Sequence, residues 1–222
     1  MENEKLSVII TGGASGIGEA IARIVINNGG NVGIIDLNSE KADLLSSELG
    51  ERCSFRQANV TDEPEFSKAY LSIKDMMPPV TGCVTCAGVL PVRDPISKHT
   101  LEDFRRVLDN HISGTFLTCK IIGTDMAERK NGAIVTLSSV LAVRPGPVLG
   151  YGAAKAGVVN LSQSLAVQWG KDNVRVNTIC PGWVDTPFIR KQEEDGRDLS
   201  PIIDMTPIGR MIKPEEIAKL AY

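Results

Sequence analysis

The stretch TGGASGIG, residues 11–18, lies between a short apolar, β-branched run at residues 5–10 and a segment with helical spacing of apolar residues at 19–28. Glycines at a strand-to-helix turn let the backbone fold tightly and approach a ligand closely. The start of the helix adds free N–H groups and the positive end of its dipole. The spacing is G-x-x-x-G-x-G, not G-x-G-x-x-G, but its position after a strand and before a helix fits a phosphate-binding loop. We therefore predict a phosphate site at this turn.

Strand-like and helix-like segments alternate along the rest of the chain. We predict strands at residues 5–10, 31–37, 53–58, 82–86, 133–138 and 174–179, and helices at 19–28, 39–49, 63–74, 101–126 and 151–169. This alternation is typical of an α/β fold, here a Rossmann-like doubly wound parallel sheet with helices on both faces. Residues 186–206 show no clear periodicity, and their charged patch at 190–198 predicts a solvated loop.

Composition restricts the class of protein. The 222 residues are 42% hydrophobic and 23% charged, and the net charge is -3 with no block of like charges, which argues against disorder and against a nucleic-acid or membrane surface. No apolar stretch is long enough for a signal peptide or a spanning helix. The cysteine count of five is odd, and we interpret these cysteines as reduced, in a cytoplasmic protein. The C-x-x-C at residues 83–86 lies within a predicted strand without a second pair, so we expect no metal site.

A carboxylate, Asp36, ends the second predicted strand. In this position a carboxylate accepts hydrogen bonds from ribose hydroxyls and repels a 2′-phosphate. Neither Ser15 nor Leu37 offers a positive charge to such a phosphate. We therefore expect NAD as the cofactor, in preference to NADP.

A second group of polar residues lies further along the chain. Tyr151 and Lys155 are four residues apart on one predicted helix and share a face. Tyrosine is a poor base at neutral pH, with a pKa of about 10, and a neighbouring cation favours its phenolate form. The pair Ser138-Ser139 ends the preceding strand. A proton-transferring tyrosine beside a nucleotide loop indicates oxidation of an alcohol or reduction of a ketone.

With these motifs in this order, the chain resembles the short-chain dehydrogenase/reductases of the compact, single-domain type. The resemblance also covers the segment NVRVN at 173–177 and CPGWVDT at 180–186. It implies that Tyr151 is the acid/base, that Lys155 lowers the pKa of Tyr151 and holds the nicotinamide ribose, and that a serine orients the substrate oxygen. Ser139 is the expected serine, with Ser138 as a minor candidate.

The resemblance also implies a set of cofactor-binding residues from several segments of the chain. They are Gly12, Ser15, Gly16, Ile17, Gly18, Asp36, Leu37, Asn59, Val60, Ala87, Gly88, Tyr151, Lys155, Pro181, Gly182, Val184 and Thr186.

Three residues or pairs depart from the family pattern within this set or beside it. Thr85-Cys86 occupies the position where the family commonly has Asn-Asn. Asn59 occupies a position where an acidic residue is common, and its side-chain oxygen can still accept a hydrogen bond from the adenine amino group. Aligned on Gly114, the family's structural asparagine falls on His111. We expect that His111, which titrates near neutrality, holds a water of the proton relay to Lys155. The alternative is a histidine on the helix whose side chain fills space and has no catalytic role.

The resemblance sets further expectations. It implies a single NAD-binding Rossmann-type domain over residues 1–222 with a substrate lid loop at 186–210, a lid helix pair after Thr186, a further helix from 213, and a homodimer or homotetramer formed through the two long helices. The sequence stops at Tyr222 within that helix, so we expect the sheet without the family's last strand and one weakened subunit interface. The expected substrate is a small secondary alcohol or ketone. The alternative is a catalytically silent nucleotide-binding sensor or scaffold of the same fold.

Overall fold

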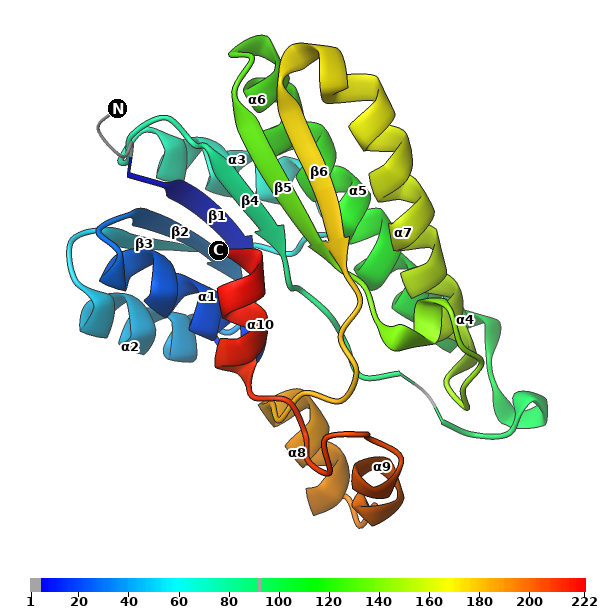
Figure 1. Cartoon of the computed structure of the whole chain (residues 1–222). Coiled ribbons are helices and arrows are strands. Elements are labelled where there is room, and N and C mark those ends of the chain that lie inside the picture. Colours follow the sequence, from blue (N-terminus) through cyan, green and yellow to red (C-terminus); the bar gives the residue numbers. More distant parts are fainter. Residues whose placement is uncertain (1–4, 92) are drawn as a thin grey trace.

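The computed structural model describes residues 5–91 and 93–222, and its centre is one parallel sheet (Figure 1). Six strands pair in the order β3-β2-β1-β4-β5-β6, and every pairing is parallel. The strands are β1 (Ser7–Thr11), β2 (Asn31–Asp36), β3 (Cys53–Gln57), β4 (Gly82–Thr85), β5 (Gly132–Leu137) and β6 (Val174–Ile179). The predicted doubly wound parallel sheet is confirmed.

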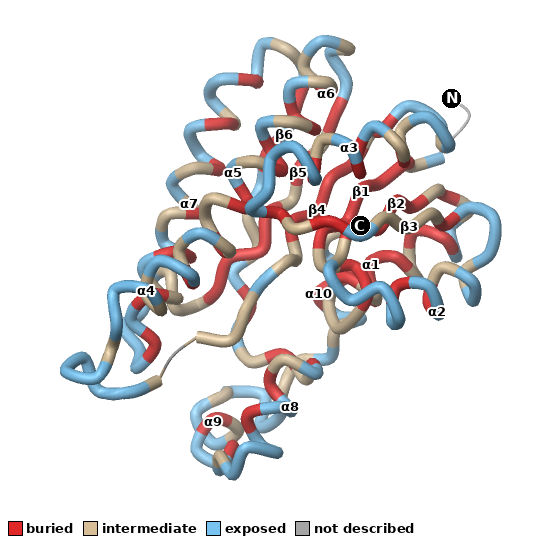
Figure 2. The backbone as a smooth tube through the Cα atoms, turned by 180° about the vertical axis from the view of Figure 1, so that it is seen from behind, coloured by how far each residue is buried: buried red, intermediate tan, exposed pale blue. Residues whose placement is uncertain are grey.

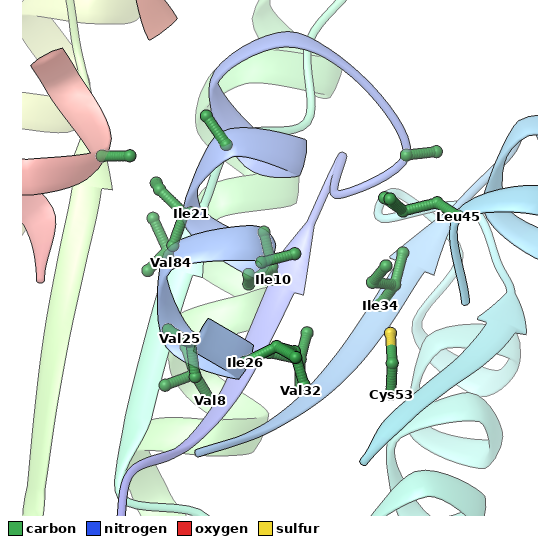
Figure 3. Close-up of a cluster of buried hydrophobic side chains, with 14 of the residues drawn as sticks. Val8, Ile10, Ile21, Val25, Ile26, Val32, Ile34, Leu45, Cys53 and Val84 are labelled. Carbon is green, nitrogen blue, oxygen red and sulfur yellow. The ribbon is translucent and has the colours of Figure 1, made fainter. Parts of the chain in front are cut away.

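Helices cover both faces of the sheet because successive strand residues point to opposite sides. On one face, Ile10 and its neighbours pack against α1 (Gly16–Asn27), α2 (Ser39–Leu49) and α10 (Pro214–Ala221), and Figure 3 shows part of this apolar cluster. On the other face, Ile9 belongs to a second cluster. The helices on that side are α3 (Glu63–Lys74), α4 (Leu101–Leu108), α5 (Gly114–Thr118), α6 (Thr124–Glu128) and α7 (Leu149–Trp169).

The predicted helix at 101–126 is continuous but not regular. Two π-helical turns, Asp109–Ser113 and Cys119–Gly123, separate α4, α5 and α6. Each π turn adds a residue to the helical repeat and so rotates the following side chains around the axis. The periodicity of apolar residues did not predict these π-helical turns. One of them contains His111.

The prediction of a loop over the charged patch was wrong. Residues Pro187–Glu194 form α8, and Ser200–Asp204 form α9, which gives the helix pair that the resemblance implied. Ile189, Leu199 and Ile202 form a small apolar cluster between them. The many charged side chains of α8 face solvent, so the sequence pattern did not reveal that one side of the helix is buried. Figure 1 shows α8 and α9 below the arrowheads of the strands, apart from the main body.

The lid segment is tied to the main body at its base. A short parallel bridge joins Val184 to Ile212, and the amide of Ile212 donates to the carbonyl of Trp183 at 2.8 Å. The chain then enters α10, which packs on α1. Figure 2 shows buried backbone concentrated in the central strands and the helix faces against them. In the part of the chain that the structure describes, no helix is long and apolar enough to cross a membrane.

Candidate active site

A single crevice gathers nearly all of the predicted site residues. It lies at the carboxyl ends of β1 and β4, where the strand order reverses, and encloses a cavity of about 320 Å³. The predicted residues that line it are Gly12, Ser15, Gly16, Ile17, Gly18, Asp36, Leu37, Val60, Ala87, Gly88, His111, Ser139, Tyr151, Lys155, Pro181, Gly182, Val184 and Thr186. Asn59 is the one predicted residue that does not line this cavity.

The glycine-rich turn is shaped by backbone requirements. Gly12 and Gly16 have φ angles of +66° and +58°, in the left-handed region that glycine adopts without strain. A Cβ on Gly18 would lie 2.3 Å from the carbonyl oxygen of Gly12, so only glycine lets α1 approach the turn this closely. The Ser15 side chain makes no capping hydrogen bond to α1, which leaves the first amides of the helix available to an anion. The turn therefore fits a phosphate group.

The Asp36 carboxylate is held at the edge of this turn. Its two oxygens accept hydrogen bonds from the amides of Ala14 at 3.0 Å and Asn38 at 2.9 Å. Each oxygen keeps a lone pair for a further donor. Asp36 thus presents a fixed negative charge beside the cavity that it lines with Leu37.

The Asn59 side chain is engaged elsewhere. Its Oδ1 accepts hydrogen bonds from both the amide and the hydroxyl of Thr61, at 3.0 and 2.9 Å. These two bonds use both lone pairs of the oxygen. The side-chain oxygen that was expected to accept from adenine is therefore committed to a turn. Sequence reasoning missed this because it assigned the oxygen from the residue type alone.

The catalytic candidates meet where β5 ends against α7. The Lys155 ammonium donates to the carbonyl of Leu137 at 2.7 Å and lies 5.6 Å from the centre of the Tyr151 ring. The two serines have different surroundings. Ser138 is buried and its hydroxyl donates to the carbonyl of Lys155 at 2.7 Å, whereas the Ser139 oxygen accepts from an amide of the following turn. Ser138 thus joins β5 to α7, and Ser139 is the serine free to orient a substrate oxygen.

The ionisation of this group differs from the sequence expectation. Burial raises the pKa of Tyr151 above its usual value, and the neighbouring Ser139 hydroxyl opposes that rise. Burial also lowers the pKa of Lys155 to about 8, against the pull of the nearby Cys86 and Cys180 thiols. In the protein alone Lys155 does not bring the Tyr151 pKa below its ordinary value, because both groups are driven towards their neutral forms.

The imidazole of His111 is a buried part of the same site. Its exposed fraction is 2%, and its ring meets the Tyr151 ring edge-on with centres 4.9 Å apart. Nε2 lies 2.9 Å from the carbonyl oxygen of Val89 and 3.3 Å from the Val89 amide nitrogen, and the shorter of the two contacts fits a proton on Nε2. A Cβ on Gly88 would lie 2.7 Å from the ring. Nδ1 is buried without a hydrogen-bond partner. An acceptor atom thus remains free inside the site.

The expectation that His111 titrates near neutrality was wrong. Burial, followed by the charge of Lys155, lowers the pKa of His111 to about 3. The imidazole is therefore neutral in the working pH range, and it can accept a hydrogen bond but not act as an acid. Sequence reasoning set aside the adjacent Asn110, yet Asn110 also lines the cavity and its Oδ1 is buried without a partner. The π turn at 109–113 rotates both side chains into the cavity, and no residue spacing signalled it.

Known proteins share this arrangement over almost the whole chain. The family model described as Enoyl-(Acyl carrier protein) reductase matches residues 12–222. A 2,5-dichloro-2,5-cyclohexadiene-1,4-diol dehydrogenase of Sphingobium indicum is 31% identical over 218 residues, covering 97% of this chain and 87% of that protein. A D-threitol dehydrogenase of Mycolicibacterium smegmatis is 36% identical over 217 residues, covering 96% and 83%.

Solved structures share the fold, and they include one complex with NADP and one with NAD. Levodione reductase superposes with a TM-score of 0.92 at 28% identity, covering 98% of this chain and 89% of that one. The structure described as ElxO with NADP bound has a TM-score of 0.90 at 28% identity, with coverages of 98% and 90%. A 3-oxoacyl-[acyl-carrier protein] reductase with bound NAD from Brucella melitensis has a TM-score of 0.86 at 29% identity, with coverages of 99% and 83%. Likeness of fold therefore does not select between the two cofactors.

Proposed function

This chain belongs to the short-chain dehydrogenase/reductase family, and from that premise we propose that it is an NAD-dependent oxidoreductase that interconverts a secondary alcohol and a ketone. One observation carries the proposal: the glycine-rich turn and the group formed by Ser139, Tyr151 and Lys155 line the same cavity. Members of this family act on small molecules and bind a nicotinamide dinucleotide, which supplies the hydride acceptor or donor.

The chain's own residues handle the proton. The Tyr151 phenolate takes the proton from the alcohol oxygen during oxidation, and the resulting hydroxyl returns it during reduction. Ser139 donates to the same substrate oxygen and fixes its position. Lys155, anchored by the Leu137 carbonyl, stabilises the phenolate form of Tyr151 and holds the ribose hydroxyls of the cofactor. Because burial alone raises the pKa of Tyr151, this assignment requires positive charge from Lys155 and the cofactor together.

His111 is proposed as the anchor of the relay water. Two observations support this role: Nδ1 is buried without a hydrogen-bond partner, and His111 lines the same cavity as Lys155. Being neutral, with its one ring proton on Nε2, His111 positions this water by accepting from it at Nδ1 and does not itself pass a proton on. The pH–rate profile of His111→Asn tests this role. Superposition of the variant profile on the parent profile removes His111 from the relay.

The preference for NAD rests on Asp36. The carboxylate is fixed beside the cavity by two backbone amides, where a 2′-phosphate would meet its negative charge. The remaining cofactor assignments follow the cavity lining, with the glycine-rich turn at the phosphates and Pro181, Gly182, Val184 and Thr186 beside the nicotinamide. Fluorescence titration with NADH and NADPH tests the preference.

The function is tested by a substrate screen with NAD⁺. The panel covers cyclic alcohols, 3-hydroxyacyl thioesters, steroids and sugar alcohols, and the readout is the appearance of NADH absorbance. We expect turnover of at least one class. If NADH binds tightly but no member of the panel is turned over, the catalytically silent sensor or scaffold is the better description.

We also propose a homodimer or homotetramer in the cytoplasm. Apolar side chains remain exposed on the long helices, among them Leu101, Phe116, Leu149 and Val167. Burying such side chains against a second copy is favourable. All five cysteines are free, which suits a reducing compartment. Light scattering during size-exclusion chromatography measures the oligomeric state.

A further inference from the structure

Asn110 lines the cavity but has no role in the proposed proton transfer. Its Oδ1 is buried without a hydrogen-bond partner, one residue before His111 on the π turn Asp109–Ser113. A buried oxygen that has lost water and gained no donor costs free energy, so such atoms are uncommon in native structures. For a side chain that lines a cavity, a ligand is the simplest source of the missing hydrogen bond.

Packing around the π turn separates the direction of Asn110 from that of His111. The His111 ring lies against the chain after β4, since a Cβ on Gly88 would lie 2.7 Å from it. Gly114 follows Asn110 by four residues, so the two lie on nearly the same face of the helical segment. A Cβ on Gly114 would lie 2.7 Å from Val60 Cγ2. The face that carries Asn110 is therefore directed towards Val60.

Val60 lies at the end of the cavity assigned to the adenosine of the cofactor. It follows β3, and β3 pairs with β2, which ends at Asp36. The Ala58 amide donates to the Asp36 carbonyl at 3.3 Å, which brings the chain after β3 beside that strand end. Asp36, Ala58 and Val60 all line the cavity. Because Asp36 is proposed to bind the adenosine ribose, Asn110 is directed to the adenosine side of the cavity.

The other asparagine near this end is already engaged. The Asn59 oxygen accepts from the Thr61 amide at 3.0 Å and from the Thr61 hydroxyl at 2.9 Å, and Asn59 does not line the cavity. Asn110 has the same carboxamide group, and its oxygen has no partner. A half turn about the last side-chain torsion exchanges the oxygen and the nitrogen, so the group can accept from a ligand or donate to it.

We propose that Asn110 makes a side-chain hydrogen bond to the adenosine half of the dinucleotide, in place of the contact expected from Asn59. The proposal rests on the nicotinamide cofactor of the function proposed above, and it makes Asn110 a residue that binds the cofactor and takes no part in proton transfer. Loss of one neutral hydrogen bond predicts binding weaker by about 3–10-fold. The loss should be the same for every ligand that contains ADP-ribose, because the nicotinamide is at the opposite end of the dinucleotide.

Titration calorimetry of three proteins with two ligands tests this. The ligands are NADH and ADP-ribose, which lacks the nicotinamide. The proteins are the parent, Asn110→Leu, which keeps the side-chain size and removes both polar atoms, and the control Asn160→Leu, which makes the same change at an exposed position of α7. We expect Asn110→Leu to bind both ligands about 3–10-fold more weakly, and Asn160→Leu to stay within about twofold of the parent for both.

A second readout separates ligand binding from a structural role. Without ligand, Asn110→Leu should melt at the temperature of the parent or above it, because an unpartnered buried oxygen is replaced by an apolar group of similar size. Weaker binding together with a lower melting temperature would show a structural role and overturn the proposal. Parent affinity for ADP-ribose in Asn110→Leu would also overturn it, and a lower kcat in that variant would then place Asn110 in the proton relay.

The binding result does not depend on the proposed oxidoreductase function. Weaker ADP-ribose binding in Asn110→Leu, with no alcohol or ketone turned over by the parent, keeps the nucleotide contact and refutes the proposed function. Turnover by the parent, with parent affinity for ADP-ribose in Asn110→Leu, does the reverse.

Discussion

The phosphate end and the catalytic end of the cavity are built in different ways. At the phosphate end, the turn at residues 11–18 depends on backbone geometry, on glycine where φ is positive, and on helix amides without side-chain caps. At the catalytic end, buried polar side chains from several segments meet, and one of their atoms, His111 Nδ1, has no partner. The phosphate end thus offers backbone amides to a ligand, whereas the catalytic end offers side-chain atoms.

This difference predicts separable effects of substitution. Changes at the phosphate end should alter stability and cofactor affinity together, because the turn is part of the core packing of α1 on the sheet. Changes at the catalytic end, apart from Lys155, which is proposed to hold the cofactor ribose, should alter rate or pH response with little effect on cofactor affinity.

Removal of the Tyr151 hydroxyl should have the largest effect on rate. We expect Tyr151→Phe to lower kcat by about 10²–10⁴-fold, since it deletes the proton-transferring group and keeps the ring that contacts His111 and Phe188. NADH affinity should stay within about twofold of the parent, well below the tenfold that 1.4 kcal/mol represents. The matched control is Tyr222→Phe, at an exposed tyrosine. Rates equal to the parent in Tyr151→Phe would contradict the assignment.

A methyl group at Gly18 should break the phosphate end. Its Cβ would lie 2.3 Å from the Gly12 carbonyl oxygen and 2.9 Å from the Gly13 Cα, so the turn must shift. We expect Gly18→Ala to lower the free energy of unfolding by about 1–3 kcal/mol and to weaken NADH binding. Gly170→Ala is the control, because nothing lies within 4 Å of its Cβ and its backbone is helical. Urea denaturation and NADH titration of both variants distinguish local crowding from a general intolerance of alanine.

Much of the fold was predictable from the sequence because it depends on local patterns. The helices at 39–49 and 63–74 and the strand at 174–179 have the predicted bounds, since clear turn residues flank regular apolar spacing. The glycine-rich turn was predictable for the same reason. The helix α8 was not, because charged residues cover all but its buried stripe at Ile189 and Gln192.

The residues of the catalytic end were predictable, but their physical state was not. Motif order pointed to Ser139, Tyr151 and Lys155, and the structure brings them to one cavity. The neutral state of His111 and the raised pKa of Tyr151 depend on burial by segments distant in the sequence. The entry of Asn110 into the cavity depends on a π turn.

The charge of Asp36, at the phosphate end, is proposed to set the preference for NADH over NADPH. Asp36→Asn keeps an acceptor for the amide of Ala14 or Asn38 but removes the negative charge. We expect the ratio of NADH to NADPH affinity to fall by about tenfold, from weaker ribose binding and reduced repulsion of the 2′-phosphate. Fluorescence titration with both cofactors measures the ratio. The NAD assignment would be contradicted by a parent protein that prefers NADPH, or by a variant with the same ratio of NADH to NADPH affinity as the parent.

The neutral state of His111 affects the pH dependence of stability, and its effect is small near neutral pH. Its pKa falls from 6.5 to about 3 on folding, so in that range the unfolded chain binds more protons and stability decreases as pH falls. His111 contributes up to about 1.4 kcal/mol per pH unit to this slope. We expect His111→Asn to show a shallower slope below pH 6.5 by urea denaturation. An unchanged slope would show that His111 is not buried in its neutral form.

The most direct measurement follows the hydride itself. The parent protein is incubated with NADH deuterated at C4 on each face in turn, together with a ketone identified by the substrate screen, and the alcohol product is analysed by mass spectrometry. We expect one deuterium at the carbinol carbon from one of the two labelled cofactors, and about 10²–10⁴-fold slower formation of this product when Tyr151→Phe replaces the parent. An alcohol product without deuterium from either cofactor, or no product from any ketone while NADH is bound, would contradict the account.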